Sequence, residues 1–255
     1  MLLATWNVNS LKMRLPRVLE FVERHKPDVL CLQETKVAAD AFPHREFEDV
    51  GYRAVDYSVG RWAGVAIVAR AETPPVNEVR GLPGEVQTVE ARWVEADIRD
   101  VRVASVYVTN GRTLDSPSYA DKLAFLDAMA ARLASLRGRS LFVAGDMNIA
   151  PEDRDVWDPS LFRGTTHTSK PERDRLCRIL DTGLVDAHRA VEPDGAQFTY
   201  WDYRAGMFHK NFGMRIDLAL VSTDLAPRLK HCGIDRDFRK GTKPSDHAPL
   251  VVELA

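Results

Sequence analysis

The chain has 255 residues, of which 45% are hydrophobic, so it is long and apolar enough to bury a full core in one or two domains. Its 35 Lys and Arg against 37 Asp and Glu give a formal net charge of -2, which excludes a globally basic nucleic-acid binder and leaves only a local basic patch for a polyanion. The three cysteines are far apart, and neither a targeting segment nor an apolar run of the ~18 residues that span a bilayer is visible. We therefore expect a cytoplasmic protein that makes no membrane contact and has no disulfides.

The first half of the chain is predicted to consist mainly of strands. Apolar and alternating runs predict strands over residues 2–8, 29–33, 52–55, 64–69, 85–97 and 101–108. The last two alternate well enough to form an antiparallel hairpin that turns at Arg99-Asp100. Between the first two strands, apolar residues recur every three or four positions over residues 14–25, which predicts an amphipathic helix that ends before Pro27.

The second half adds two helices and three strands. Ser116-Pro117 is typical of a helix start, and apolar spacing carries this helix to about Gly138. A second helix is predicted over residues 172–180, and strands over residues 141–144, 215–222 and 250–254. The polar stretch 152–170 is too long for a simple loop, so it either has a function or contains short helices. Strands dominate and no linker divides the chain, which favours two packed sheets with helices on their outer faces.

Polar residues recur where the predicted strands end. The run Leu141–Ala144 is followed by Gly145, then by Asp146 and Asn148, which point to the same side in extended geometry. Asn7 and Glu34 stand at the ends of the first two strands in the same way. Taken singly, each of these patterns is also typical of an ordinary strand-to-loop turn. Their repetition favours one shared site.

The complete set of such residues is Asn7, Glu34, Tyr107, Asp146, Asn148, Asp217, Asp246 and His247. Carboxylate and amide oxygens without a cysteine ligand suit a hard cation such as Mg²⁺ or Mn²⁺. Several carboxylates around one histidine can cleave a phosphate ester, with the metal on a phosphate oxygen and an Asp that activates water.

Five stretches closely resemble the exonuclease III family of abasic-site endonucleases, within the endonuclease/exonuclease/phosphatase superfamily. They are Trp6–Leu11, Leu32–Lys36, Gly145–Pro151, Arg215–Asp217 and Ser245–Pro249, in the order in which the family has them. The resemblance implies one α+β domain over residues 1–255, a four-layer α/β sandwich with two mostly antiparallel sheets. It further implies a monomer that uses Mg²⁺, or Mn²⁺ in its place, to cleave double-stranded DNA 5′ to abasic sites. Activity at 3′ ends, as a 3′→5′ exonuclease and a 3′-phosphatase or phosphodiesterase, is also implied.

The resemblance also assigns roles to individual residues. The metal ligands would be Glu34, Asn7 and Asp246. The catalytic residues would be Tyr107, Asp146, Asn148, Asp217 and His247, with Asp146 on the attacking water and Asp217 holding the ring of His247. The substrate would be bound by Tyr200, Met214, Ile216, Arg215 and Lys240.

Two positions depart from the family pattern, and two other functions stay open. Thr109 stands where relatives often have Pro, so the loop after Tyr107 is expected to be less rigid. Tyr200 stands where many relatives have Trp or Phe, so the abasic pocket is expected to be wetter. Residues 200–243 carry nine Lys and Arg against five Asp and Glu, a modest local excess that a solvated surface could share. The alternatives are a superfamily phosphatase that acts on a small or lipid phosphate, and a catalytically inactive DNA-binding protein.

Overall fold

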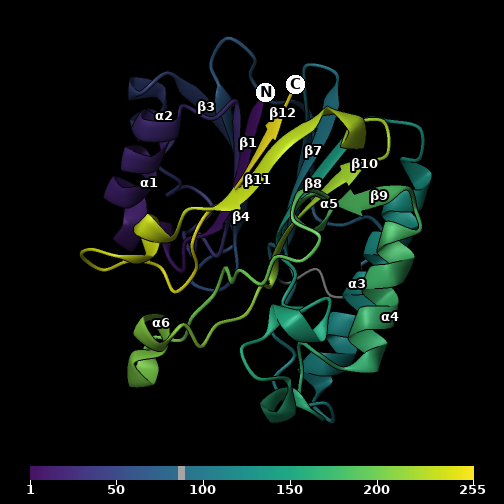
Figure 1. Ribbon diagram of the computed structural model, residues 1–255. Helices are drawn as coiled ribbons and strands as arrows, with labels where there is room; N and C mark the ends of the chain where they lie inside the picture. The colour runs from purple at the N-terminus through teal and green to yellow at the C-terminus, as the bar shows by residue number, and fades with distance from the viewer. Residues whose placement is uncertain (86–89) are drawn as a thin grey trace.

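The computed structural model describes residues 1–85 and 90–255, and within these residues twelve strands form two six-stranded sheets (Figure 1). The first sheet runs in the order β11 (Leu229–Ile234), β12 (Leu250–Leu254), β1 (Leu2–Asn7), β2 (Val29–Gln33), β4 (Val65–Arg70), β3 (Tyr52–Tyr57). The second runs in the order β5 (Val76–Arg80), β6 (Trp93–Ile98), β7 (Val101–Tyr107), β8 (Leu141–Asp146), β10 (Asp217–Ser222), β9 (Leu184–Asp186). Among the described strands, β1–β2 and β7–β8 pair in parallel and the other neighbours are antiparallel, which confirms the predicted mostly antiparallel sheets.

Helices cover the outer face of each sheet, so the molecule has four layers (Figure 1). The α-helices are α1 (Leu11–His25), α2 (His44–Asp49), α3 (Pro117–Ser135), α4 (Lys170–Leu180), α5 (Ala187–Val191) and α6 (Met207–Lys210). Short 3₁₀ helices cover Asp153–Asp155, Pro159–Phe162, Arg204–Gly206, Ala226–Arg228 and Arg236–Arg239. The helix pair α1 and α2 packs on the first sheet and the pair α3 and α4 on the second, which confirms the predicted sandwich.

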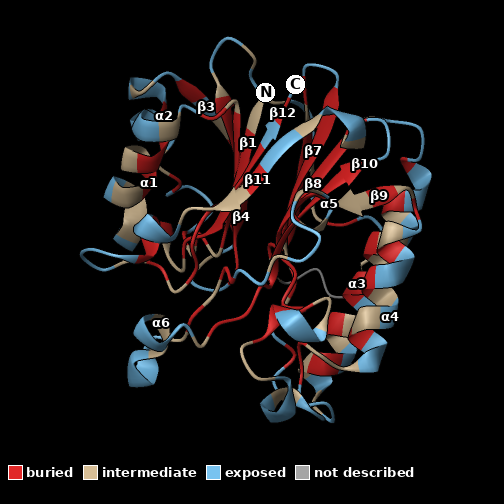
Figure 2. Ribbon diagram, viewed as in Figure 1, coloured by how far each residue is buried: buried red, intermediate tan, exposed pale blue. Residues whose placement is uncertain are grey.

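Three apolar clusters hold the layers together, and Figure 2 shows the strands buried between the helices. Residues such as Ile67 and Phe142 meet between the two sheets. Phe21 of α1 belongs to the cluster outside the first sheet, and Met129 of α3 to the one outside the second. Because each sheet is covered on both faces, its central strands are apolar on both sides, which explains their short and continuous apolar runs.

Helices α3 and α4 begin at capping residues, whereas α1 begins at Leu11, three positions before its predicted start, and Ser10 gives it no side-chain cap. At the start of α3, Ser116 accepts a hydrogen bond from Tyr119 N, and Pro117 occupies the first helical position. At the start of α4, Ser169 and Glu172 form a reciprocal capping box. The polar stretch 152–170 contains two 3₁₀ helices, which agrees with the prediction that it could contain short helices.

The prediction of a strand over residues 85–97 is wrong at its beginning, because β6 starts only at Trp93. Part of that predicted segment, residues 86–89, lies outside the described residues. The sequence patterns also missed the strands β5, β9 and β11 and the short helices α2, α5 and α6. The three strands lie at sheet edges. β9 has only three residues, and β5 and β11 are partly exposed, so they lack the apolar alternation by which a half-buried strand is recognised.

The two parallel pairs determine where the polar residues meet. Parallel neighbours end at the same edge of a sheet, so β1 and β2 bring Asn7 and Glu34 together, and β7 and β8 do the same for Tyr107 and Asp146. Strand β10 runs antiparallel to β8 and begins at this edge, with Asp217 opposite Asp146. None of the described helices is both long and apolar enough to cross a membrane.

Candidate active site

A cavity of about 190 Å³ opens at this edge, where strand ends from both sheets converge. It is lined by Glu34, Tyr107, Asn110, Asp146, Asn148, His167, Tyr200, Met214, Ile216, Asp246 and His247. Nine of these eleven residues are predicted site residues. The structure thus brings together side chains that are as much as 213 positions apart, between Glu34 and His247.

The donor set in the cavity fits a hard cation. Glu34, Asp146 and His247 each offer a ligand-type atom, and these atoms lie within 4.8 Å of one another. Asn7 connects the two carboxylates, because its Nδ2 donates to Glu34 Oε1 at 2.8 Å and to Asp146 Oδ2 at 2.9 Å. Its oxygen accepts from Asn9 N at 3.0 Å instead of facing the carboxylates. Two carboxylate oxygens are therefore the ligands that the site offers to Mg²⁺ or Mn²⁺.

His247 is held in one orientation by Asp217. The ring Nδ1 lies 2.7 Å from Asp217 Oδ2, and both side chains are buried. Burial lowers the pKa of His247, but the charges of Asp217 and Asp146 raise it overall to about 10. A protonated imidazole donates from both nitrogens and cannot ligate a metal, so Nε2 is available to donate to an anion. Asp246, which precedes His247 in the sequence, lies on the cavity wall and accepts a hydrogen bond from Asn9 Nδ2 at 3.1 Å.

Asp146 and Tyr107, which also line the cavity, have perturbed pKa values as well. Burial raises the pKa of Asp146 to about 8, against the opposing charge of His247. A cation beside this carboxylate would favour its charged form and lower that pKa. Burial also raises the pKa of Tyr107 well above its usual value, and the charges of Glu34 and Asp146 add to the effect. The phenol therefore keeps its proton and can donate a hydrogen bond.

The sharp turn after β8 places Asn148 in the cavity. Gly145 has φ +154, and a Cβ there would lie 1.9 Å from Val106 O, so only glycine allows β8 to approach β7 this closely. Asn148 N donates to Asp146 Oδ1 at 2.9 Å, and its Nδ2 donates to Asp146 Oδ2 at 3.1 Å and to Val108 O at 2.8 Å. These bonds use both hydrogens of the Asn148 amide, so its Oδ1 is the atom that can accept a hydrogen bond from another cavity residue.

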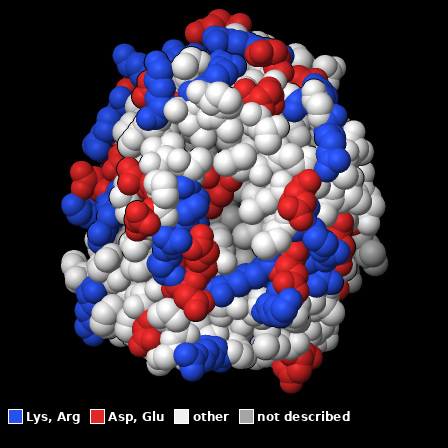
Figure 3. Space-filling model, turned by 45° about the vertical axis from the view of Figure 1, so that its right-hand side comes forward, with Lys and Arg blue, Asp and Glu red and all other residues white. Residues whose placement is uncertain are grey.

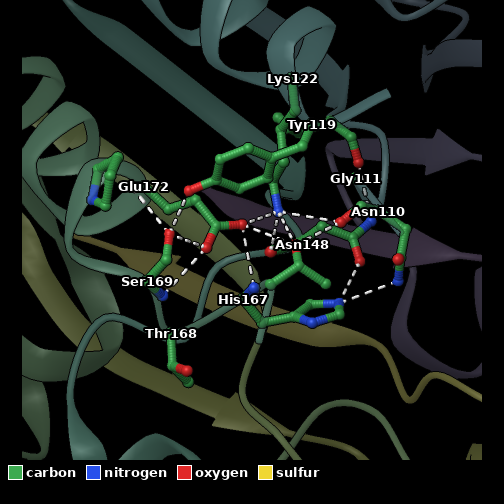
Figure 4. Close-up of polar contacts among 12 residues, drawn as sticks. Asn110, Gly111, Tyr119, Lys122, Asn148, His167, Thr168, Ser169 and Glu172 are labelled. Carbon is green, nitrogen blue, oxygen red and sulfur yellow. Dashed lines mark hydrogen bonds and ion pairs between the residues drawn. The ribbon is translucent and has the colours of Figure 1, made fainter. Parts of the chain in front are cut away.

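The motifs did not select Asn110 or His167, which also line the cavity. In Figure 4 one nitrogen of the His167 ring faces the side chains of both Asn110 and Asn148. Its Nε2 is 3.1 Å from Asn148 Oδ1 and 3.0 Å from Asn110 Nδ2. Burial lowers the pKa of His167 to about 4, so the ring is neutral. Its Nε2 faces both an acceptor, Asn148 Oδ1, and a donor, Asn110 Nδ2, and each tautomer of the ring can satisfy one of the two.

The sequence carried only weak signals for these two residues. Asn110 precedes Gly111 in a dipeptide that is typical of turns, three positions after Tyr107. His167 lies in the polar stretch 152–170, for which a function was one of the two interpretations. No spacing within that stretch distinguishes His167 from its polar neighbours.

Three of the predicted substrate residues line the cavity. Tyr200 pairs by an isolated bridge with Met214 and by another with His247, and its ring lies 4.9 Å from the ring of His247 between centroids. Met214 and Ile216 are buried beside it. Together they form an aromatic and aliphatic wall of the cavity beside His247. Trp201, by contrast, is fully buried and belongs to a separate cluster.

Arg215 and Lys240 do not reach this cavity. Arg215 lies between Met214 and Ile216 in extended chain, so its side chain points to the opposite face and is fully buried. It donates to Asp155 Oδ1 at 2.7 Å and to Asp186 Oδ2 at 2.8 Å. Lys240 is exposed, and its Nζ pairs with Asp237 at 2.6 Å.

Charge on the surface is mixed. Figure 3 shows Lys and Arg side chains interspersed with Asp and Glu on the face turned forward, including the surroundings of a central hollow. Several cations of the segment 200–243 have partners, among them Arg204 with Asp202 and Lys240 with Asp237. Part of the local excess of basic residues is therefore offset by acidic partners.

Comparisons with known proteins match the whole chain. The model of the Endonuclease/Exonuclease/phosphatase family covers residues 4–247. Exodeoxyribonuclease III of Haemophilus influenzae is 32% identical over 269 aligned residues, which cover 98% of this chain and 98% of the relative.

Solved structures give the same result. The 3′-5′ exonuclease NExo of Neisseria meningitidis superposes with a TM-score of 0.97 and 39% identity, over 100% of this chain and 99% of the other. A Neisseria structure described as 3′ phosphatase NExo, bound to a product DNA hairpin, has a TM-score of 0.97 and 38% identity over the same shares. An AP endonuclease from Archaeoglobus fulgidus has a TM-score of 0.95 and 34% identity, again over 100% and 99% of the two chains.

Proposed function

The chain belongs to the endonuclease/exonuclease/phosphatase family, and from this membership we propose that it is a DNA repair nuclease that hydrolyses phosphate esters. The observation that carries the proposal is the arrangement in the cavity. A protonated His247, held by Asp217, lies in one cavity with the carboxylates of Glu34 and Asp146, and the three side chains offer polar atoms within 4.8 Å of one another.

Each side chain of the cavity has a chemical role in this proposal. His247 donates its Nε2–H to a non-bridging phosphate oxygen and stabilises the charge that develops there. Asp146 orients the attacking water and accepts its proton, while Asn148 holds Asp146 in place. Tyr107 donates its phenolic hydrogen to the phosphate or to the leaving oxygen. A Mg²⁺ or Mn²⁺ ion bound by Glu34 and Asp146 would polarise the phosphate oxygens.

We infer that the ends of DNA strands are the first substrate. The NExo structures, described as a 3′-5′ exonuclease and a 3′ phosphatase, share 39% and 38% identity with this chain, against 34% for the AP endonuclease from Archaeoglobus. The reaction proposed is therefore removal of a 3′ phosphate, or of a 3′ nucleotide, from double-stranded DNA.

Incision 5′ to an abasic site is the second candidate. The wall of Tyr200, Met214 and Ile216 is apolar and lies beside His247, so it can contact a sugar that carries no base. An abasic nucleotide also costs less to turn out of the duplex, because no base must be unstacked. A phosphatase of small or lipid phosphates has no corresponding observation in its favour, and the intact acidic set argues against an inactive DNA-binding protein.

One experiment tests these functions together. Three duplex oligonucleotides, one with a 3′ phosphate at a nick, one with an abasic analogue and one undamaged, are incubated with the protein in excess chelator and then in Mg²⁺ or Mn²⁺. We expect hydrolysis only with the metal, fastest on the 3′ phosphate, slower at the abasic site and slowest on undamaged DNA. Glu34→Gln should lower turnover at limiting Mg²⁺, whereas Glu23→Gln, on the exposed face of α1, should not.

Three results would contradict the proposal. Undiminished turnover in excess chelator would refute the proposed metal dependence. Wild-type rates of Glu34→Gln at limiting Mg²⁺ would show that Glu34 is not a metal ligand. Hydrolysis of a soluble phosphate monoester, without action on any of the three duplexes, would assign the chain to the small-phosphate enzymes.

A further inference from the structure

A fully buried ion pair lies directly behind one wall of the cavity (Figure 4). Lys122 of α3 and Glu172 of α4 contact each other, and neither side chain has any exposed surface. The ammonium also donates to Asn148 O at 2.7 Å, and lies 3.2 Å from Thr166 Oγ1 and 3.3 Å from Asn110 O. A fully buried lysine is rare in proteins, and here its neighbours include the backbones of two cavity residues.

The carboxylate of Glu172 holds the third cavity residue. Its Oε1 accepts from His167 N at 3.0 Å and from Thr166 Oγ1 at 2.8 Å, and its Oε2 accepts from Ser169 N at 3.0 Å. His167 has φ 77, in the left-handed region that residues other than glycine usually avoid. The hydrogen bond to Glu172 therefore stabilises the backbone conformation that turns the ring of His167 into the cavity.

Three separate loops thus meet at one pair of charges. The first loop follows β7 and supplies Asn110 to the cavity. The second follows β8 and supplies Asn148, and the third precedes α4 and supplies His167. The first loop passes close over the lysine stem, because a Cβ at Gly111 would lie 3.1 Å from Lys122 Cδ. Thr166 links the loops further, because its hydroxyl oxygen also lies 2.7 Å from Asn110 O, which is an alternative acceptor to Glu172 for its one hydrogen.

Fold stability alone is a weak reason for such a pair. Removing two charges from water costs free energy that their mutual attraction often does not recover, so apolar replacements of similar size are frequently as stable. What an apolar pair cannot supply is a set of directed hydrogen bonds to several loops. Burial lowers the pKa of His167, and the positive charge of Lys122 lowers it further, so the ring stays neutral.

We propose that Lys122 and Glu172 are positioning residues, which hold Asn110, Asn148 and His167 as one rigid wall of the cavity. The effect on turnover rests on the proposed nuclease function, whereas the effect on the geometry of the wall does not. Displacing a substrate-contacting group by about 1 Å can cost about 100-fold in rate, so modest loosening of these loops is enough to impair the reaction.

The test removes both charges together. The double variant Lys122→Met/Glu172→Gln keeps similar side-chain volumes and leaves no unpaired buried charge. We expect kcat on the 3′-phosphate duplex to fall by about 10- to 100-fold, with KM changed much less. The matched control is Arg102→Met/Glu95→Gln, which removes a buried pair 3.0 Å apart at the other end of β7. It should keep kcat within about twofold, because no cavity residue contacts this pair.

A second readout does not need activity. In side-chain ¹⁵N NMR spectra the amides of Asn110 and Asn148 and the ring of His167 should shift or broaden in the double variant but not in the control. If the wild-type protein hydrolyses no DNA, the proposed function fails, and these spectra still decide whether the pair positions the wall. Equal losses of kcat in the two double variants, or unchanged spectra of the three side chains, would overturn the positioning role.

A milder variant covers the case in which the double variant does not fold. Thr166→Val keeps both charges and the side-chain shape but removes the hydroxyl that joins the pair to the Asn110 loop. We expect a smaller loss of kcat and a shift of the Asn110 amide resonance. Wild-type kcat together with an unchanged Asn110 resonance would refute the proposal by itself.

Discussion

Arg215→Met tests whether the arginine of the Arg-Ile-Asp stretch serves the core or the substrate. Its guanidinium is fully buried and donates to Asp155 at 2.7 and 3.2 Å and to Asp186 at 2.8 Å. Methionine fills a similar space but leaves both carboxylates without this partner. The substitution is therefore expected to act on the free energy of unfolding and not on DNA binding.

The magnitude follows from the partners that remain. Removing one member of a buried ion pair costs about 3–5 kcal/mol. Asp155 keeps Arg189, whose Nη2 lies 2.8 Å from its Oδ1, and Asp186 still accepts from His188 N at 3.1 Å. We therefore expect the lower end of the range, about 3 kcal/mol, which corresponds to a Tm lower by about 6–12 °C for a chain of this size.

The assay combines thermal unfolding with DNA binding at a temperature where the variant is folded. Arg204→Met is the control, because Arg204 is 85% exposed and pairs only with Asp202 among its described neighbours. It should leave Tm unchanged. The reasoning is refuted if Arg215→Met keeps the wild-type Tm but binds DNA more weakly, with a salt dependence reduced by about one unit.

Two further predictions concern the reaction. Asp217→Asn and His247→Asn should each reduce turnover by about 10²–10⁴-fold, and the double variant should lose less than the product, because Asp217 acts through the ring. Asp217→Asn should also lower the pKa of His247 from about 10, measured by NMR titration of the chelated protein, and fully multiplicative losses would contradict the pairing. Tyr200→Ala should reduce the ratio of kcat/KM on abasic over undamaged duplexes and affect 3′-phosphate removal much less. An unchanged ratio in a folded variant would assign Tyr200 to packing.

Much of the fold was predictable because its signals are local. The helices α3 and α4 carry their own caps and apolar spacing, and both begin within one or two residues of the predicted positions. Edge strands such as β5 were missed because a strand with solvent on most of its surface needs no apolar alternation. Its existence depends on pairing with β6, which is a long-range property of the sheet.

The polar site was predictable for a related reason. Parallel strands end at a common edge, so Asn7 could be expected beside Glu34, and Tyr107 beside Asp146, once they were placed at strand ends. That the two pairs meet depends on how the two sheets pack. His167 could not be found in this way, because it stands in a loop whose path is determined by Glu172 and not by a strand. The partners Lys122 and Glu172 are 50 positions apart, and nothing in either helix pattern indicates that they meet.

The sequence by itself determined the types of chemistry, the periods of the helices and strands, and the residues that end them. Only the tertiary structure decided which side of an extended segment faces the cavity. Met214 and Ile216 alternate with Arg215, and period-two geometry requires that Arg215 point away from the other two. Which of the two faces meets His247, and which meets Asp155, depends on how the segment packs against the rest of the chain, because both faces find buried partners far away in the sequence.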